Sequence, residues 1–89
     1  MKTNSKLKVE NFCGVKNQFI ITTGKGRYFQ SYDSIIAFIP NKGPIELDVV
    51  YYNYSNTTSK YLNRFLGNTS KETKSKLIRG EYKLTNLNN

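Results

Sequence analysis

The chain has 89 residues, enough for one domain with a thin core, and it carries a formal net charge of +8. It contains no histidine and a single cysteine, Cys13. Imidazole-based acid–base catalysis and an intramolecular disulfide are therefore excluded, and a zinc site would lack its usual ligands. A lone cysteine is typical of a protein from a reducing cytoplasm, and its simplest role is that of a small core residue.

The positive charge is concentrated toward the C-terminal end of the chain. Residues 54–89 hold seven basic and two acidic side chains, whereas residues 1–53 hold seven basic and four acidic ones. Such a field attracts nucleic acid, an acidic protein or an anionic membrane. AT-rich codon usage is an alternative explanation, because lysine and asparagine occur eleven times each.

The hydropathy pattern predicts a protein that does not enter the membrane. No apolar stretch approaches the roughly 20 residues that a membrane-spanning helix needs. The N-terminus lacks the long apolar segment of a signal peptide. We therefore expect a soluble cytoplasmic protein without a membrane partner.

The first half of the chain predicts strands. Residues 7–10 alternate between apolar and polar side chains, which suits a short strand, and residues 1–6 are expected to form a loose end. Residues 17–23 are β-branched and aromatic, and they predict a strand. Gly24-Lys25-Gly26 supplies a tight turn before a return strand over residues 27–32.

Two more strands are expected on either side of a loop bounded by Pro40 and Pro44. Residues 35–39 are apolar on both faces, which favours a central strand. Residues 45–52 alternate at first, so that Glu46 and Asp48 point outward together. These two carboxylates lie close enough to share a metal ion, but a solvated strand face explains them better without further acids nearby.

Two amphipathic helices are predicted after the strands. The first covers residues 57–67, where short polar side chains offer a cap and Gly67 supplies a stop. The second covers residues 70–79 and begins at Thr69-Ser-Lys-Glu72, a capping-box pattern in which the Thr hydroxyl and the Glu carboxylate bond each other's free backbone amides.

The predicted fold is α+β, with residues 1–89 in a single domain. An antiparallel meander of about four strands, over residues 17–52, packs against the two C-terminal helices. A short edge strand over residues 81–85 and a loose end over residues 86–89 complete the chain. The expected core consists of Ile20, Ile35, Ala37, Ile39, Leu47, Val49, Leu62, Phe65, Leu66, Leu77 and Ile78.

Two local patterns have both a functional and a structural interpretation. Gly24-Lys-Gly-Arg27 suggests a phosphate cradle, but it has only half of a P-loop and no Lys-Ser/Thr ending, so a basic hairpin turn is favoured. The two adjacent helices suggest a helix-turn-helix motif. Asn63 and Asn68 stand where that motif wants apolar residues, so two helices packed on a sheet are the default.

Tyrosines accompany basic residues in the predicted hairpin. Seven aromatic residues could form an exposed stacking surface beside Lys25 and Arg27: Tyr28, Tyr32, Tyr51, Tyr52, Tyr54 and Tyr61, with Phe29. Aromatic and basic side chains on one sheet face bind single-stranded nucleic acid by base stacking and phosphate contact. The structural alternative is that tyrosine prefers half-buried strand positions for its own packing.

Three segments follow one another in a characteristic order: Ser31-Tyr-Asp-Ser-Ile-Ile-Ala37, Tyr54-Ser-x-Thr-Thr-Ser-Lys-Tyr-Leu-x-x-Phe-Leu-Gly67 and Lys71-Glu-Thr-x-x-Lys-x-Ile-x-x-Gly-Glu-Tyr-x-Leu84. Over about residues 28–89 the chain resembles a family of small uncharacterised proteins from phages and mobile elements of low-GC Gram-positive bacteria. The resemblance implies a phage or mobile-element setting inside a bacterial host, and it implies no catalytic residues.

We therefore expect a non-enzymatic phage or mobile-element accessory protein that acts by binding in the host bacterial cytoplasm, with no cofactor and no bound metal. Nucleic acid is the first expected partner. The alternative is an acidic host protein, a defence or replication factor that the chain inhibits by docking, as an anti-CRISPR or host-takeover factor does. A homodimer is compatible with the sequence. The residues expected to make contact are Lys25, Arg27, Lys60, Arg64, Lys71, Lys74, Arg79, Tyr28 and Tyr32.

Overall fold

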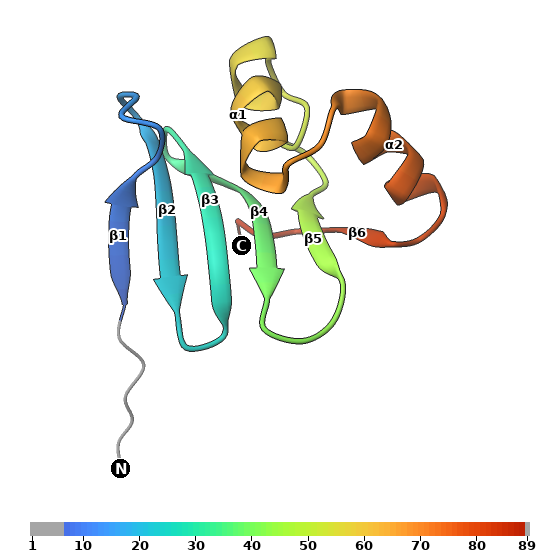
Figure 1. Cartoon of the computed structure of the whole chain (residues 1–89), viewed down its shortest axis with the longest axis horizontal. Coiled ribbons are helices and arrows are strands. Elements are labelled where there is room, and N and C mark those ends of the chain that lie inside the picture. The colour runs from blue at the N-terminus through green and yellow to red at the C-terminus, as the bar shows by residue number, and fades with distance from the viewer. Residues whose placement is uncertain (1–6, 89) are drawn as a thin grey trace.

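The computed structural model describes residues 7–88, and Figure 1 shows one sheet with two helices beside it. Five strands come first along the chain, the helices follow, and one strand ends the fold. The predicted α+β class is confirmed, and the expected loose end over residues 1–6 lies outside the described residues. The elements are β1 (Lys8–Asn11), β2 (Gln18–Thr23), β3 (Gly26–Ser31), β4 (Ser34–Pro40), β5 (Ile45–Asp48), α1 (Asn56–Leu66), α2 (Ser70–Ile78) and β6 (Tyr82–Thr85).

Within residues 7–88 the strands form one six-stranded sheet in the order β1-β2-β3-β4-β5-β6. Neighbours are antiparallel from β1 to β5, whereas β6 pairs in parallel with β5. A parallel pair needs a long crossover, and α1 and α2 supply it. The prediction of about four strands was too low, because the short strands at the two ends of the chain also join the sheet.

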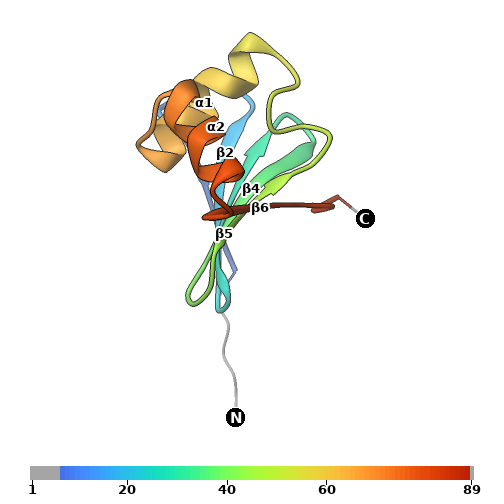
Figure 2. The same ribbon diagram turned by 90° about the vertical axis from the view of Figure 1, so that its right-hand side faces the viewer.

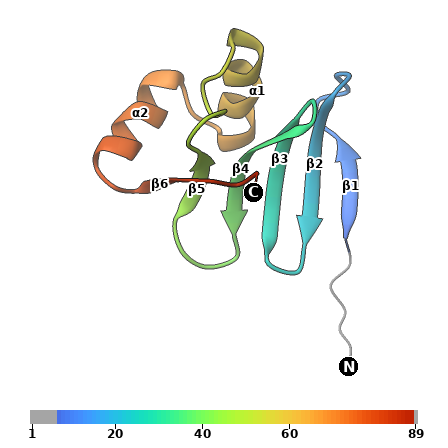
Figure 3. The same ribbon diagram turned by 180° about the vertical axis from the view of Figure 1, so that it is seen from behind.

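Different segments of the chain lie against the two faces of the sheet. The side view in Figure 2 places α1 and α2 on one side of the strands, and the segment after β6 runs toward the other side. Figure 3, seen from the opposite side to Figure 1, shows this segment crossing in front of β5 toward β4. We call the side with α1 and α2 the helix face and the opposite side the open face.

Strand register decides which side chains reach each face. Phe29 lies opposite Ala37, and both are completely buried on the helix face, where the Phe29 ring stacks on Phe65 of α1 with the centroids 5.5 Å apart. Tyr28 lies opposite Phe38 on the open face, and their rings stack at 4.3 Å. Successive side chains of a strand point to opposite faces, so neighbours in the β3 sequence serve different surfaces.

Both helices begin and end as their sequences predict. The Ser55 hydroxyl accepts a hydrogen bond from the Thr58 amide at 3.1 Å, and Gly67 ends α1 in the left-handed conformation, with φ at 73°. The Thr69 hydroxyl accepts from the Glu72 amide, and the Glu72 carboxylate accepts from the Thr69 amide, which completes the capping box of α2. Because these signals are local, sequence alone identifies both helices.

The core is centred on β3, β4, β5 and α1. Four expected core residues lie outside the core: Val49 is exposed, Ile78 is 86% exposed at the last turn of α2, and Ile35 and Ile39 are half-buried without packing on the core cluster. The strand ends before Val49, and Ile78 follows Leu77, the residue of that turn that packs on the core. The fully or nearly fully buried apolar residues are Phe29, Ile36, Ala37, Leu47, Tyr61, Leu62 and Tyr82.

Asp48 departs most from the sequence prediction, because it is only 1% exposed instead of pointing outward with Glu46. Its carboxylate accepts hydrogen bonds from the backbone amides of Val50 at 3.0 Å, Tyr51 at 2.9 Å and Leu87 at 2.8 Å. Aspartate commonly bonds the amides two and three residues ahead in this way and so begins a turn. The predicted strand over residues 45–52 therefore stops at Asp48.

The last described residues are fastened to the sheet, in contrast to the loose end expected over 86–89. The Asn88 side-chain oxygen accepts from the Ile35 amide at 2.7 Å, and the Asn88 amide group donates to the Ile35 carbonyl at 2.9 Å. This pair of bonds imitates the exchange between neighbouring strands at the start of β4. Together with the bond from Leu87 to Asp48, it holds the end of the chain against the open face.

Candidate nucleic-acid interface

Two cations of α1 lie on the ring of a buried tyrosine. Lys60 and Arg64 are one helical turn apart, and both are exposed. The Lys60 Nζ lies 5.4 Å and the Arg64 Cζ 5.5 Å from the centroid of the Tyr61 ring. Cations at this distance from an aromatic ring are attracted by it. The apolar stems are therefore held on the helix while the charged groups face the solvent.

Arg27 of β3 adds a third cation beside α1. Its Cζ lies 5.7 Å from the centroid of Phe65, which is one turn after Tyr61 on the same helix. Arg27 thus comes to the same helix as Lys60 and Arg64 from a strand more than thirty positions earlier in the sequence. We call Arg27, Lys60 and Arg64 the α1 basic cluster.

The described part of the chain contains two ion pairs, and neither involves the α1 basic cluster. Lys8 pairs with Glu10 at 3.6 Å, and the Arg79 Nε pairs with the Glu81 carboxylate at 2.9 Å. Arg79 was expected at the contact surface, but its charge is compensated by this neighbour. The charges of the α1 basic cluster remain available to an outside anion.

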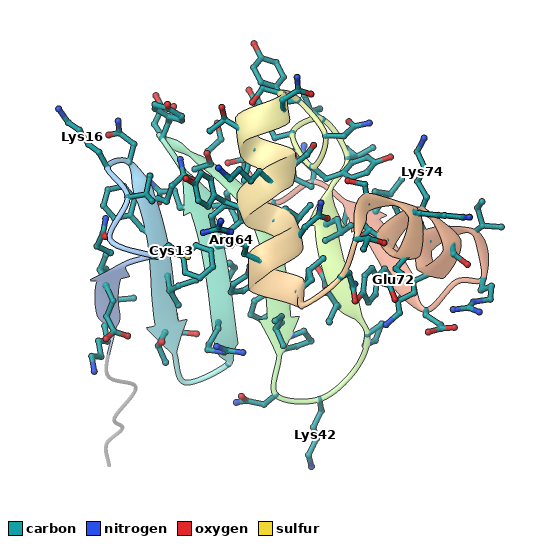
Figure 4. All side chains as sticks on the ribbon, turned by 45° about the horizontal axis from the view of Figure 1, so that its top comes forward. Cys13, Lys16, Lys42, Arg64, Glu72 and Lys74 are labelled. Atoms are coloured by element: carbon teal, nitrogen blue, oxygen red, sulfur yellow. The ribbon has the colours of Figure 1, made fainter. Side chains whose placement is uncertain are left out.

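The two expected lysines of α2 extend the positive surface in another direction. Lys71 and Lys74 are exposed. Figure 4 shows Arg64 on the side of α1 toward β2 and β3, whereas Lys74 projects from α2 away from the sheet. The expected residues on the helices therefore point in more than one direction, and contacts with shared aromatic rings join only those at α1.

The expected combination of hairpin tyrosines with basic residues does not form. Arg27 packs against Phe65 on the helix face, whereas Tyr28 stacks on Phe38 on the open face. Tyr32 stands in the β3–β4 turn, at the opposite end of β3 from Lys25. These residues were grouped by their spacing in sequence, but the alternation of the strand separates them.

The two helices do not stand free as a helix-turn-helix unit. The Asn63 side chain donates a hydrogen bond to the Ser70 hydroxyl at 2.9 Å, and Asn68 donates to the Tyr82 hydroxyl of β6 at 2.6 Å. Leu77 packs on the core from α2. The polar residues that weakened the motif in the sequence join the helices to each other and to the sheet.

The sequence did not predict a cavity that lies at one end of the sheet, beside the β3–β4 turn. It has a volume of about 320 Å³ and lies between that turn, the connection from β5 to α1, and the first turn of α1. Its lining residues are Ser31, Tyr32, Asp33, Ser34, Ile36, Tyr51, Tyr54, Ser55 and Thr58. Tyr32, Tyr51 and Tyr54 belong to the aromatic group that the sequence suggested as a stacking surface, but only the fold brings these three together around a cavity.

The described residues also bear on a metal site and on a membrane-spanning helix. Among residues 7–88, no three His, Cys, Asp or Glu side chains gather closely enough to hold a metal ion. The Glu46 and Asp48 pair considered above does not present two free carboxylates, because Asp48 is buried on backbone amides. Neither described helix combines the length and the apolar character required to cross a membrane.

Comparison with curated proteins and with solved structures gives no match. A comparison with protein families does give one, over residues 3–81, which is most of the chain. These residues include the α1 basic cluster, both helices and the first five strands. The chain therefore belongs to the family described as "Family of unknown function (DUF8033)".

Proposed function

We propose that this protein is a non-enzymatic accessory protein that contacts nucleic acid through the α1 basic cluster and the neighbouring lysines of α2. The observation that supports it best is the placement of Arg27, Lys60 and Arg64, three cations without an ion-pair partner in residues 7–88, on two aromatic rings of one helix. The resemblance found in the sequence supports a phage or mobile-element setting for this function, within the host bacterial cytoplasm.

The packing of the cluster favours binding to a phosphate backbone. Long basic side chains normally lose rotamer freedom when they bind, and that loss weakens association. Stems already held against Tyr61 and Phe65 lose less of this freedom. Each neutralised phosphate also releases a condensed counterion, which drives binding at low salt. The net charge of +8 steers a polyanion toward the protein from a distance.

A second candidate is inhibition of an acidic host defence or replication protein through the same surface together with exposed tyrosines. Exposed tyrosines support it, since Tyr54 is 71% and Tyr32 is 55% exposed, and tyrosine is enriched in protein–protein interfaces. In this case the partner is a single host protein, and binding does not depend on nucleic acid.

One experiment separates the two candidates. The protein is used to capture partners from host lysate, with and without nuclease treatment, and the captured material is compared. Nucleic-acid binding predicts that the captured proteins disappear after nuclease treatment and that oligonucleotides are recovered without it. One host protein that remains after nuclease treatment would support the inhibitor instead.

Charge-reversal variants then test the surface itself. Lys60→Glu combined with Arg64→Glu should weaken binding to a labelled oligonucleotide by about tenfold or more at low salt, because two attractive contacts become repulsive. The matched control is Lys16→Glu with Lys42→Glu, which changes the charge equally on loops at two separate ends of the sheet. Equal weakening by both pairs would mean that total charge, and not this cluster, determines binding.

A further inference from the structure

The outer side of β1 has no neighbouring strand within residues 7–88. β1 stands at one end of the strand order, and Figure 1 shows it beside β2 alone. All four of its residues, Lys8–Asn11, are exposed. An edge strand of this kind leaves a row of backbone N–H and C=O groups that can pair with a strand of another molecule.

The hydrogen bonds of β1 fix which of its backbone groups face outward. The Phe12 amide donates to the Gln18 carbonyl at 2.7 Å, which continues the register between β1 and β2. In an antiparallel pair, residues that bond the neighbouring strand alternate with residues that face away from it. The even-numbered residues of β1 therefore bond β2, whereas Val9 and Asn11 direct their amides and carbonyls outward. A strand added at this edge must pair with these two residues.

Two opposite charges flank Val9 along the edge. Lys8 and Glu10 pair within the chain at 3.6 Å, and their side chains are 67% and 55% exposed. Charges on an edge strand normally discourage pairing with another strand. Here the signs are opposite and are spaced symmetrically about Val9. A second β1 that runs antiparallel therefore presents Glu10 to Lys8 and Lys8 to Glu10, so that the strand is complementary in charge to itself.

The charges also distinguish the possible registers of two antiparallel β1 strands. A register centred on Lys8 places two lysines opposite each other, and one centred on Glu10 does the same with two glutamates. Like charges directly opposite each other destabilise a strand pair. A register centred on Val9 instead places each Lys8 opposite the Glu10 of the second copy. These are the non-hydrogen-bonded positions, where facing side chains approach most closely.

The register centred on Val9 also brings exposed apolar side chains together on the open face. Val9 is 57% and Leu7 is 70% exposed. Val9 lies opposite Ile21, which lies opposite Tyr28, so it continues an apolar row on the open face. In the paired strands the two Val9 side chains meet, and each Leu7 lies diagonal to the Val9 of the second copy, within contact range. Pairing therefore removes apolar surface from water.

We propose that two copies of this chain pair antiparallel through β1, with a two-fold axis at Val9, and form a dimer with one continuous sheet. The axis is perpendicular to the sheet, so the helix faces of both copies lie on the same side and their α1 basic clusters face the same way. This inference goes beyond the proposed function and does not depend on it, because the dimer forms without nucleic acid. Since one short strand makes a small interface, the dimer dissociates on dilution.

Sedimentation equilibrium of the protein without nucleic acid measures the association. The series runs from micromolar to millimolar protein at a salt concentration of about 0.15 M, where screening over about 8 Å limits the repulsion between two molecules of net charge +8. The average mass should rise toward two chains and no further, because a two-fold interface is closed. A mass that stays at one chain, or that rises beyond two, would overturn the proposal.

Complementary charge variants locate the interface. Lys8→Glu places two acidic pairs across the axis and Glu10→Lys places two basic pairs, so each variant alone should dimerise about tenfold more weakly. A mixture of the two variants should form a heterodimer at least as tightly as the unaltered protein dimerises, because an acidic strand then faces a basic one. The pair between Lys8 and Glu10 within one chain is absent from both variants, so it cannot explain recovery on mixing. A mixture that associates no better than either variant alone would contradict an interface at β1.

A backbone variant and amide exchange test the outward hydrogen bonds. Val9→Pro removes an amide that faces away from β2, so this variant should fold and remain a monomer. In the unaltered protein, hydrogen exchange at the Val9 and Asn11 amides should slow as the protein concentration rises. Lys42→Glu, on the loop between β4 and β5, makes the same charge change as Lys8→Glu and should dimerise normally. Dimerisation of Val9→Pro as tight as that of the unaltered protein would exclude pairing through β1.

Discussion

Asp48 shows how a charged residue can be built into the interior of a small basic protein. Burial by itself would raise the pKa of this carboxyl group, but hydrogen bonds from the Leu87 and Tyr51 amides, the Asn88 side chain and the Val50 amide hold its pKa below the ordinary value of 3.8. Three of these partners are backbone groups from two distant parts of the chain. The carboxylate therefore joins the end of β5 to the C-terminal segment.

Replacing Asp48 should destabilise the protein. Asp48→Asn keeps the size of the side chain but removes the negative charge and one acceptor, so we expect the free energy of unfolding to fall by about 2–4 kcal/mol. Urea denaturation followed by circular dichroism measures it. Asp33→Asn, at an exposed position, should change stability by less than about 0.5 kcal/mol. Equal stability of the two variants would show that the bonds to Asp48 contribute nothing.

The pH dependence of the free energy of unfolding should also show the effect of the Asp48 carboxyl group. Because the pKa of Asp48 is lower in the folded protein, its stabilising effect is complete above the ordinary pKa of 3.8 and is lost as the pH falls through the folded pKa. The lowered pKa of Glu72, held down by the Thr69 amide and hydroxyl, acts in the same direction. In Asp48→Asn, the loss of stability in acid should be smaller than in the unaltered chain.

At the scale of single elements, the β2–β3 hairpin depends on Gly26. Its φ of 151° is strained for other residues, and an added Cβ would collide with the Ile39 carbonyl oxygen, the Pro40 Cα and the Phe38 ring of the adjacent strand. Gly26→Ala should therefore cost about 3 kcal/mol or more, because backbone strain and overlap add together. The melting temperature and the denaturant midpoint measure this cost.

Gly43→Ala is the matched comparison for the hairpin. Gly43 also has a positive φ, of 100°, but an added Cβ there meets nothing within 4 Å. The Gly43→Ala variant should lose only the stability that the unfavourable backbone conformation costs, about 1 kcal/mol. If both variants lose the same stability, the close approach of β4 to Gly26 has no energetic effect.

The capping box of α2 should make a smaller contribution to stability. Thr69→Ala removes the hydroxyl that accepts from the Glu72 amide, and a lost cap of this kind typically costs about 1 kcal/mol. Ser75→Ala, at an exposed position within the same helix, serves as the control and should be close to neutral. A Thr69→Ala protein as stable as the control would mean that tertiary contacts alone fix the start of α2.

Elements with local signals could be predicted from sequence, and elements set by distant contacts could not. The glycine turn before β3 and the caps of both helices lie within a few residues of the structure they determine. The burial of Asp48 depends in part on an amide 39 positions later, that of Leu87, which no pattern around Asp48 indicates. The parallel pairing of β6 likewise depends on the path of the whole crossover.

At the scale of the whole molecule, the six acidic residues compensate little of the positive charge near α1. Glu10 and Glu81 pair with Lys8 and Arg79, Glu72 caps α2, and Asp48 is buried on amides. The described acids are thus largely engaged away from the α1 basic cluster. Charge in the sequence therefore predicted a basic surface that the acidic residues do not compensate, although not the arrangement of that surface.

The candidate site could be predicted only in part. Lys60 and Arg64 were identifiable because helical periodicity places them one turn apart on a polar side. Arg27 reaches them through sheet register, and the same register sends Tyr28 to the open face. The nine expected residues therefore divide into the cluster on α1, a continuation on α2, and residues that lie elsewhere or are paired.

The most direct test is the salt dependence of oligonucleotide binding, measured by fluorescence anisotropy for the unaltered protein and for the Lys60→Glu and Arg64→Glu double variant. The logarithm of the association constant should fall linearly with the logarithm of salt concentration, with a slope of about −0.7 to −0.9 for each neutralised phosphate. In the double variant that slope should become shallower by about 1.4–1.8, the share of two contacts. A slope that is flat, or that is identical in the two proteins, would contradict the central claim that the α1 basic cluster contacts nucleic acid.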